Sequence, residues 1–300
     1  MILVVGATGI LGGMITRQLL REGKEVRILV RKNSPSEQLA LQGMATTAKS
    51  LIEAGAEPIY GDMKEPATLA IACRGIETVI TTANSAMRGG DDTVDSVDRK
   101  GNRNLIEAAE VAGLEQFIFI SFFGASPDNP LPLLQAKAET EQRLMQSKMN
   151  FTILSPNFFI ESWAGMVVGI PLQARQPITL VGQGTRLHSL ISMKDVAAFA
   201  VAVVGNSSAI NQKMILGGPE PLTWQGIVGA FGKVLGSELP VQYVAPGTPM
   251  PGLPEMVPAV LAGMETYDSP IPMEQTALNY GVKMTPLITT IQAMLNIPAA

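Results

Sequence analysis

The chain has few of the residues on which metal, disulfide and nucleic-acid chemistry depend. It contains one cysteine and one histidine among 300 residues. A disulfide within the chain is therefore excluded, and these two residue types cannot build a zinc cluster, so no metal site is expected. Charged residues make up 16% of the chain and the net charge is −4. This balance does not favour a nucleic acid as partner.

Long apolar runs are also missing. The stretches richest in apolar residues are interrupted by Lys, Asp or Pro, and none approaches the roughly 18 uncharged residues of a membrane span. Met1 leads directly into an apolar segment, which leaves no room for a signal or transit peptide ahead of it. We expect a soluble, cytoplasmic protein without a membrane partner. Cys73 lies in an apolar stretch and is expected to be a buried structural thiol.

Glycine, by contrast, is abundant and regularly spaced at the start of the chain. The apolar residues Ile2–Val5 predict a buried strand, and three glycines follow at the spacing G-x-x-G-x-x-G. The first permits a tight turn, the second lets a pyrophosphate approach the backbone, and the third lets a helix over about residues 10–21 pack on the strand. That helix would turn free N–H groups toward the phosphates. The segment predicts a dinucleotide site rather than a turn that binds nothing, with contacts from Gly6, Thr8, Gly9, Ile10, Leu11 and Gly12.

The end of the second predicted strand, Glu25–Val30, indicates which dinucleotide is bound. A site for NAD(H) usually places Asp or Glu near this position to accept a hydrogen bond from the ribose 2′-hydroxyl. This chain has Arg31 instead, followed by Lys32 and, two residues on, Ser34. A guanidinium there can clamp a 2′-phosphate through charge-assisted hydrogen bonds. NADP(H) is therefore favoured and NAD(H) stays possible; the alternative is a merely solvated strand end.

Strands and helices alternate through the first half, which predicts an α/β fold with a doubly wound parallel sheet. Helices are expected near residues 37–54, 66–73 and 91–112, and strands at 57–62, 78–83 and 116–121. The ends of the third and fourth strands should add cofactor contacts, with Asp62 near the adenine; the set is Asp62, Met63, Thr82, Ala83 and Asn84. The charged residues 95–103 are expected to form a solvated helix face.

These motifs resemble the atypical short-chain dehydrogenases of the NmrA-like group, in the NAD(P)-binding Rossmann superfamily. The resemblance spans most of the chain. It rests on the glycine loop, Arg31, Gly61-Asp62, the strand from Thr78, Ser121, Lys137, Ser155–Phe159, Ser189–Ser192 and Asp195–Ala197. The group includes isoflavone-type reductases, quinone reductases, a triphenylmethane dye reductase and regulators that sense the nicotinamide pool. The resemblance therefore implies a fold and a cofactor class but not one activity.

The resemblance also marks catalytic residues and one departure. Reductases of the superfamily combine a serine ending strand five with a tyrosine and, four residues later, a lysine. It thus assigns Ser121 and Lys137 to catalysis, and Lys137 to the cofactor ribose as well, but Leu133 stands where the tyrosine is expected. An electron-poor acceptor such as a quinone, a cationic dye or an enone needs no phenol, because solvent can deliver the proton after hydride transfer. A surface lysine on a helix over 136–146 is the alternative for Lys137.

The second half changes character, with many prolines and methionines and a dense run of helix breakers at residues 246–254. We expect a dinucleotide-binding domain over 1–155, to which 188–217 returns, and a substrate-binding lid over 156–300. Helices are expected near 224–235, 254–264 and 286–295. An apolar lining suited to flat, bulky ligands is predicted from Phe158, Phe159 and Trp163, and His188 is a candidate proton donor. The alternatives are ordinary core residues and a histidine with a structural role.

Two classes of function follow. The first is an NADPH-dependent reductase of an apolar, conjugated small molecule, and the second is an NAD(P)-binding redox sensor without turnover. An epimerase or dehydratase is a third, but it too would need the missing tyrosine. The apolar lid favours the reductase, because a sensor needs no substrate cavity. A homodimer stays open.

Overall fold

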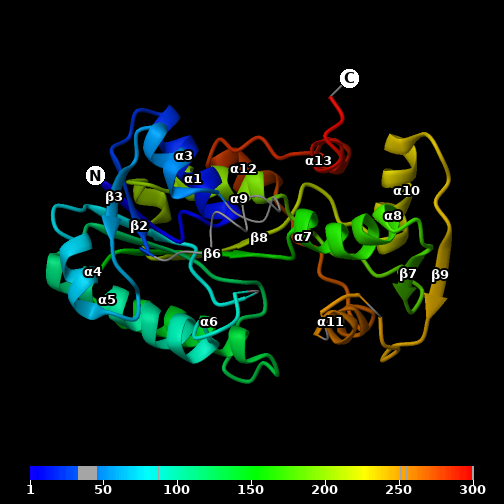
Figure 1. Cartoon of the computed structure of the whole chain (residues 1–300), viewed down its shortest axis with the longest axis horizontal. Coiled ribbons are helices and arrows are strands. Elements are labelled where there is room, and N and C mark those ends of the chain that lie inside the picture. Colours follow the sequence, from blue (N-terminus) through cyan, green and yellow to red (C-terminus); the bar gives the residue numbers. More distant parts are fainter. Residues whose placement is uncertain (33–45, 87, 251, 255, 299–300) are drawn as a thin grey trace. The chain divides into compact units, whose positions relative to one another are not determined.

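The computed structural model describes residues 1–32, 46–86, 88–250, 252–254 and 256–298. The chain divides into two compact units (Figure 1). The first contains Met1–Pro156 and Val196–Ile215, and the second contains Asn157–Asp195 and Leu216–Ala300. Each unit is thus built from two separate stretches of sequence.

The first unit is built on a seven-stranded sheet in the order β3-β2-β1-β4-β5-β6-β8. Neighbouring strands from β3 to β6 all pair in parallel. This confirms the predicted doubly wound α/β fold, and the sheet also contains β8, a strand from late in the chain. The strands are β1 (Ile2–Val5), β2 (Val26–Val30), β3 (Glu57–Tyr60), β4 (Thr78–Thr81), β5 (Gln116–Ile120), β6 (Phe151–Pro156) and β8 (Gln212–Leu216).

Helices cover both faces of this sheet. Figure 1 shows α1, α3 and α9 on one face and α4, α5 and α6 on the other. Of the helix predicted over 37–54, the structure describes only α3, because residues 33–45 lie outside the described part. The helix predicted over 91–112 is divided into a π-helical segment, Val94–Gly101, and α5. The bounds are α1 (Ile10–Arg21), α3 (Ala48–Glu53), α4 (Pro66–Ala72), α5 (Asn102–Ala112), α6 (Pro132–Met145) and α9 (Met193–Ala202).

The core on the α4 and α5 face holds the carboxyl ends of the central strands in place. Leu3, Phe117 and Phe119 are fully buried there, together with Leu105. Burying each such side chain contributes about 1.5–3 kcal/mol. Cys73 belongs to the same cluster, and its burial raises the pKa of the thiol to about 11. The prediction of a buried structural thiol is therefore confirmed.

The second unit is mainly helical, with one small parallel sheet formed by β7 (Ile178–Val181) and β9 (Val241–Val244). The three helices predicted for this region are present within two residues at each described end. The small sheet was not predicted, because its four-residue strands lie far apart in the sequence and carry little local signal. The helices are α7 (Ile160–Ala164), α8 (Ile170–Gln173), α10 (Trp224–Leu235), α11 (Met256–Met264), α12 (Glu274–Asn279) and α13 (Leu287–Met294), and a short π-helical segment, Gly165–Gly169, links α7 to α8.

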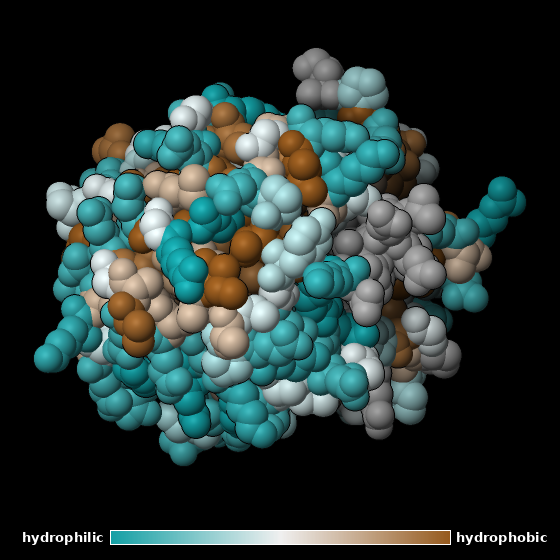
Figure 2. All heavy atoms as spheres, turned by 60° about the vertical axis from the view of Figure 1, so that its left-hand side comes forward, coloured by the Kyte–Doolittle hydropathy of each residue, from teal (hydrophilic) through white to brown (hydrophobic). Residues whose placement is uncertain are grey.

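The face of the molecule brought forward in Figure 2 is mostly hydrophilic. Apolar side chains appear on it in patches that polar side chains separate. Within the described ranges, no helix combines the length and the apolar character that crossing a membrane requires.

Candidate functional site

The glycine loop between β1 and α1 is tightly constrained at two of its three glycines. Gly6 has a φ of +85°, and a Cβ there would lie 2.6 Å from Thr82 Oγ1. A Cβ on Gly12 would lie 2.2 Å from the carbonyl oxygen of Gly6. No side chain fits at either position, so the close approach of helix and strand requires both glycines.

Gly9 differs, because its backbone conformation does not require glycine. Its φ of −74° and ψ of 165° suit any residue, although a Cβ would make one tight contact, 3.3 Å from Gly6 O. Gly9 is also the N-cap of α1, and no side-chain hydrogen bond caps the helix among the described residues. The N–H groups in the first turn of this twelve-residue helix are thus left for another acceptor. A loop without side chains before an uncapped helix fits a pyrophosphate.

A cavity of about 60 Å³ opens beside this loop, within the first unit. It lies where β1 to β4 end, which is where doubly wound sheets bind ligands. Seven residues predicted from the sequence to bind cofactor line it: Gly6, Thr8, Arg31, Asp62, Met63, Ala83 and Asn84. The sequence missed six others: Val5, Leu29, Gly61, Arg88, Asp92 and Val97.

Most of the other predicted contacts lie in or near the glycine loop. Gly9, Ile10, Leu11 and Gly12 form the helix cap and first turn. Thr82 Oγ1 donates to Gly6 O over 3.3 Å, and so supports the turn. Lys32 is exposed, and Ser34 lies outside the described residues.

Arg31 is already engaged by a carboxylate. Its Nη1 donates to Asp92 Oδ2 over 2.7 Å, while Lys64 Nζ donates to Asp92 Oδ1 over 3.0 Å. Burial alone would raise the pKa of Asp92, but the hydrogen bonds and charges of Lys64 and Arg31 outweigh burial and hold that pKa below its usual value. Asp92 is therefore ionised at neutral pH. The predicted topology could have suggested this pair, because the loop after β4 must reach the same sheet edge as the end of β2.

Lys137 lies deep in the first unit, at the carboxyl end of β5. Its Nζ donates to Ile120 O over 2.8 Å and lies 4.7 Å from the ring centre of Phe119. Only 6% of the residue is exposed, so the alternative of a surface lysine is wrong. Burial lowers the pKa of Lys137, although the charges of Asp98 and Glu141 act in the opposite direction.

Ser121 follows β5 beside this lysine, but its hydroxyl is engaged elsewhere. Its Oγ donates to Glu141 Oε1 over 2.5 Å, and Lys213 Nζ donates to Glu141 Oε2 over 2.6 Å. These bonds tie β5 and β8 to α6. Leu133 lies one turn before Lys137 on α6 and is partly buried.

The charged stretch 95–103 is not wholly solvated, so that expectation is wrong for Asp98. This residue is fully buried, and its Oδ2 accepts from the N–H of Ser85 at 3.0 Å and from its hydroxyl at 2.6 Å. Ser85 thus satisfies Oδ2 of this buried carboxyl group, whereas Oδ1 has no hydrogen-bond partner among the described residues. The contact connects the loop after β4 to the π-helical segment.

The substrate residues predicted from the sequence lie in the second unit. Phe158 is buried and packs edge to face on Trp163, with ring centres 4.8 Å apart, and Phe159 is partly buried beside them in sequence. His188 is 1% exposed. Its Nδ1 lies 2.8 Å from Ser269 Oγ and its Nε2 lies 3.0 Å from Met264 O. A carbonyl only accepts, so Nε2 carries the proton and Nδ1 accepts from the serine.

The burial of His188 predicts that the stability of the protein depends on pH. Burial lowers the pKa of His188, so between that lowered pKa and about 6.5 the unfolded chain binds a proton that the folded chain does not. The free energy of unfolding should therefore fall from pH 7 to pH 5, by at most about 1.4 kcal/mol per pH unit from one proton. Urea unfolding at both pH values should show a smaller fall for His188→Gln. An equal fall in both proteins would contradict this.

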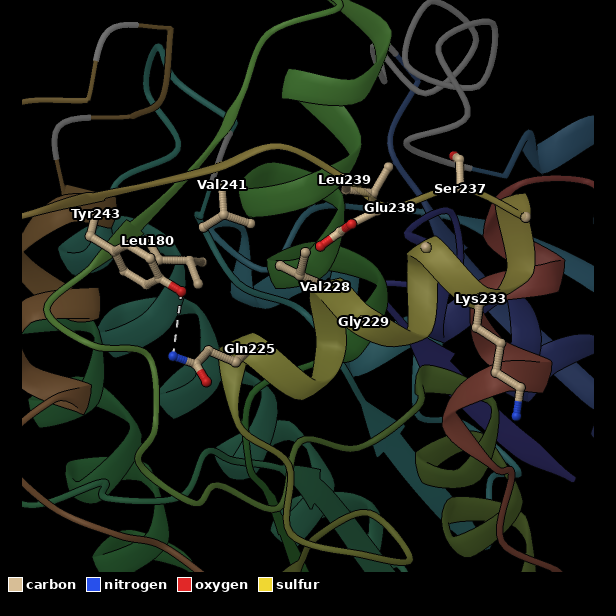
Figure 3. Close-up of a pocket in the computed structure, with 12 residues that line it drawn as sticks. Leu180, Gln225, Val228, Gly229, Lys233, Ser237, Glu238, Leu239, Val241 and Tyr243 are labelled. Carbon is tan, nitrogen blue, oxygen red and sulfur yellow. Dashed lines mark hydrogen bonds between the residues drawn. The ribbon is translucent and has the colours of Figure 1, made fainter.

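A second cavity, of about 590 Å³, lies along α10 in the second unit. Figure 3 shows Leu180, Tyr243 and Gln225 at one end of it and Ser237 and Lys233 at the other. Gln225 Nε2 donates to Tyr243 Oη over 3.4 Å. Gly229 opens the wall of α10, because a Cβ there would meet nothing within 4 Å. None of the substrate residues predicted from the sequence lines this cavity.

Comparisons with known proteins agree with the geometry. The sequence profile of the NmrA-like family matches residues 1–281. The chain belongs to the NmrA-like family. The resemblance seen in its motifs is thereby confirmed.

Within the described ranges, no group of three or more His, Cys, Asp and Glu side chains is placed to hold a metal ion.

Two similar curated proteins carry different names. The photosystem II assembly factor Ycf39 of Guillardia theta is 33% identical over 217 residues, which cover 72% of this chain and 64% of that protein. The match thus spans less than two thirds of Ycf39. The NAD(P)H azoreductase of Xenophilus azovorans is 30% identical over 246 residues, which cover 82% of this chain and 77% of the azoreductase.

Solved structures share the fold. The NADPH complex of an Escherichia coli quinone oxidoreductase matches with a TM-score of 0.75 and 20% identity. The match covers 99% of this chain and 100% of the oxidoreductase chain. The NADP(H) complex of the Citrobacter sp. triphenylmethane reductase has a TM-score of 0.77 and 19% identity, and covers 98% and 100%.

Proposed function

We propose that this chain is an NADPH-dependent reductase that transfers hydride to an apolar, conjugated small molecule such as a quinone, a dye or an enone. The proposal rests chiefly on one observation. A glycine loop without side chains precedes an uncapped helix and lies beside a cavity lined by Arg31. The names of the azoreductase relative and of the quinone and triphenylmethane reductases support the substrate class.

The residues of the first unit fit NADPH, which when bound supplies the hydride. The N–H groups in the first turn of α1 would hold the pyrophosphate, whereas the N–H of Gly9 already donates to Gly6 O over 3.0 Å. Arg31 would bind the 2′-phosphate, and Asp62, on the same cavity, would accept from the adenine amino group. Lys137 would donate to the ribose hydroxyls, because one of its three N–H groups already bonds Ile120 O and so fixes its position.

The proton that completes the reaction has no phenol donor in this arrangement. Leu133 occupies the position one helical turn before Lys137, where the tyrosine would be expected. An acceptor that is already electron-poor takes hydride without prior protonation, and solvent then supplies the proton. The missing phenol therefore favours quinones, dyes and enones over simple ketones.

Lys137→Met is expected to weaken NADPH binding and to lower turnover only moderately, because the proposed role is to bind ribose. An obligatory general acid would behave differently, with turnover falling by roughly a hundredfold while affinity is kept. Titration with NADPH and single-turnover rates separate the two outcomes.

Leu133→Tyr is the matching gain-of-function variant, because it places a phenol one turn from Lys137. We expect it to add measurable reduction of simple carbonyls, with quinone or dye reduction unchanged. Activity toward carbonyls in the wild type, at the level of the variant, would contradict this account of the missing tyrosine.

A direct test of the proposed function is to saturate the protein with NADPH and to follow nicotinamide absorbance during a screen of quinones, azo dyes, triarylmethane dyes and enones. We expect turnover with at least one of these classes and none with saturated analogues. Failure of every acceptor, in protein shown to bind NADPH, would overturn the reductase.

The names of the Ycf39 relatives favour a second function, an NAD(P)-binding protein that acts through a protein partner. Such a protein would bind NADPH and reduce none of the acceptors. Its partner binding would change between the reduced and the oxidised cofactor, which a pull-down with each cofactor form would detect.

A further inference from the structure

Asp92 holds Arg31, the residue that the proposed function assigns to the 2′-phosphate. The ion pair measures 2.7 Å, and Lys64 binds the second carboxylate oxygen at 3.0 Å. Only 10% of the Asp92 side chain is exposed, against 27% for Arg31. Asp92 is thus a largely enclosed anion, bound by two cations, and not a solvated loop residue.

The same cavity gathers further charge. Arg88 lines it together with Arg31, Asp62 and Asp92. Burial lowers the pKa of Arg88, and so does the neighbouring charge of Arg31, whereas the charge of Asp92 raises it. The carboxylate of Asp92 therefore offsets a local excess of positive charge, which is the role that a bound phosphate would have.

Asp92 occupies a donor that a 2′-phosphate would use. The carboxylate accepts from Nη1 of Arg31, which leaves fewer of the guanidinium N–H groups for another anion. A phosphate within hydrogen-bond reach of Arg31 would therefore compete with Asp92 for the same guanidinium, and would bind less tightly than it would to a guanidinium without this partner.

A ribose 2′-hydroxyl, in contrast to a 2′-phosphate, needs a hydrogen-bond acceptor. A site for NAD(H) usually supplies this acceptor as an acidic residue. The acidic residue is absent at the end of β2, but Asp92 brings a carboxylate to the same guanidinium from the loop after β4. One position can thus hinder the phosphate and accept from the hydroxyl.

We propose that Asp92 sets the choice between NADP(H) and NAD(H), by occupying Arg31 against the 2′-phosphate and by accepting from the 2′-hydroxyl. This inference rests on the proposed dinucleotide binding. It implies that the chain accepts both cofactors and that Asp92 keeps the preference for NADP(H) smaller than Arg31 alone would make it.

The test is Asp92→Asn, which keeps shape and removes charge. Calorimetry would measure dissociation constants for NADPH, NADH and the fragments adenosine 2′,5′-bisphosphate and adenosine 5′-monophosphate. We expect the variant to bind NADPH and the bisphosphate about tenfold more tightly, and to bind NADH and the monophosphate no more tightly than the wild type. In an Arg31→Ala background the gain should vanish, because no guanidinium remains to be released.

Asp95→Asn is the matched control. Asp95 lies three residues after Asp92, in the π-helical segment. It is exposed and pairs with exposed Lys100 at 2.8 Å, and it does not line the cavity, so the variant makes the same change in net charge outside it. We expect it to leave all four dissociation constants unchanged.

Three outcomes would overturn the inference. In the first, Asp92→Asn weakens binding of the bisphosphate as Arg31→Ala does, which would mean that Asp92 positions Arg31 for the phosphate. In the second, the dissociation constants of Asp92→Asn equal those of Asp95→Asn, which would show that Asp92 does not discriminate between NADP(H) and NAD(H). If neither the wild type nor the variant binds any dinucleotide, the proposed function fails together with the inference, and that result is distinct from the other two.

Discussion

Gly9→Val is expected to abolish binding of both NADPH and NADH while the first unit stays folded. The backbone at Gly9 has an extended conformation that valine adopts readily, and a Cβ there meets only Gly6 O, at 3.3 Å. The branched side chain would instead fill the space above the N-terminus of α1. Losing two charge-assisted hydrogen bonds to the pyrophosphate, each worth about 1.5–3 kcal/mol, corresponds to at least about a hundredfold in affinity.

Calorimetric titration with each cofactor measures this effect, and circular dichroism with thermal unfolding checks the fold. Gly229→Val is a matched control, because the same substitution in α10 meets open space and lies in the second unit. Gly12→Val should fail for a different reason, since its Cβ would lie 2.2 Å from Gly6 O and the helix could not pack. Normal NADPH affinity in Gly9→Val would mean that the loop is structural only.

Arg31→Ala has the second largest expected effect. It should weaken NADPH binding roughly tenfold or more and leave NADH almost unchanged, because only NADPH carries the 2′-phosphate. The variant also frees Asp92 from one of its two cations, and Lys64 still holds the other carboxylate oxygen.

Titration of both cofactors at one fixed salt concentration tests this selectivity. Arg21→Ala makes the same charge change at an exposed residue at the end of α1 and should affect neither cofactor. A similar loss for NADPH and NADH in Arg31→Ala would show that Arg31 supports the site as a whole and does not read the phosphate.

The parts of the fold that the sequence predicted well are those with short-range causes. The strand, glycine loop and helix at residues 2–21 follow from residues that are neighbours in sequence. The helix over 224–235 was predicted at both ends, because Thr223 caps it by accepting from Gly226 N and Gly236 ends it with a φ of +69°. Local patterns of this kind need no knowledge of tertiary contacts.

The charge pairs of the candidate site could not be predicted in the same way. Arg31 and Asp92 lie 61 positions apart, and nothing local marks them as partners. Asp98 stands among residues that suggest a solvated helix, yet the loop after β4 covers it through Ser85. The sequence therefore drew attention to Arg31 and missed the carboxylate of Asp92 that binds it.

The most direct test of the proposed function is transfer of a label. The protein would be mixed with NADPH carrying deuterium at C4 of the nicotinamide ring, on one face or on the other, together with an enone or a triarylmethane dye, because deuterium bound to carbon does not exchange with water. Mass spectrometry of the product after one turnover would show where the deuterium goes. We predict that deuterium reaches the product from NADPH labelled on one face of the nicotinamide ring and not from NADPH labelled on the other. With Gly9→Val we predict no transfer. Reduced product without deuterium, or the same labelling with Gly9→Val, would contradict hydride transfer at this site.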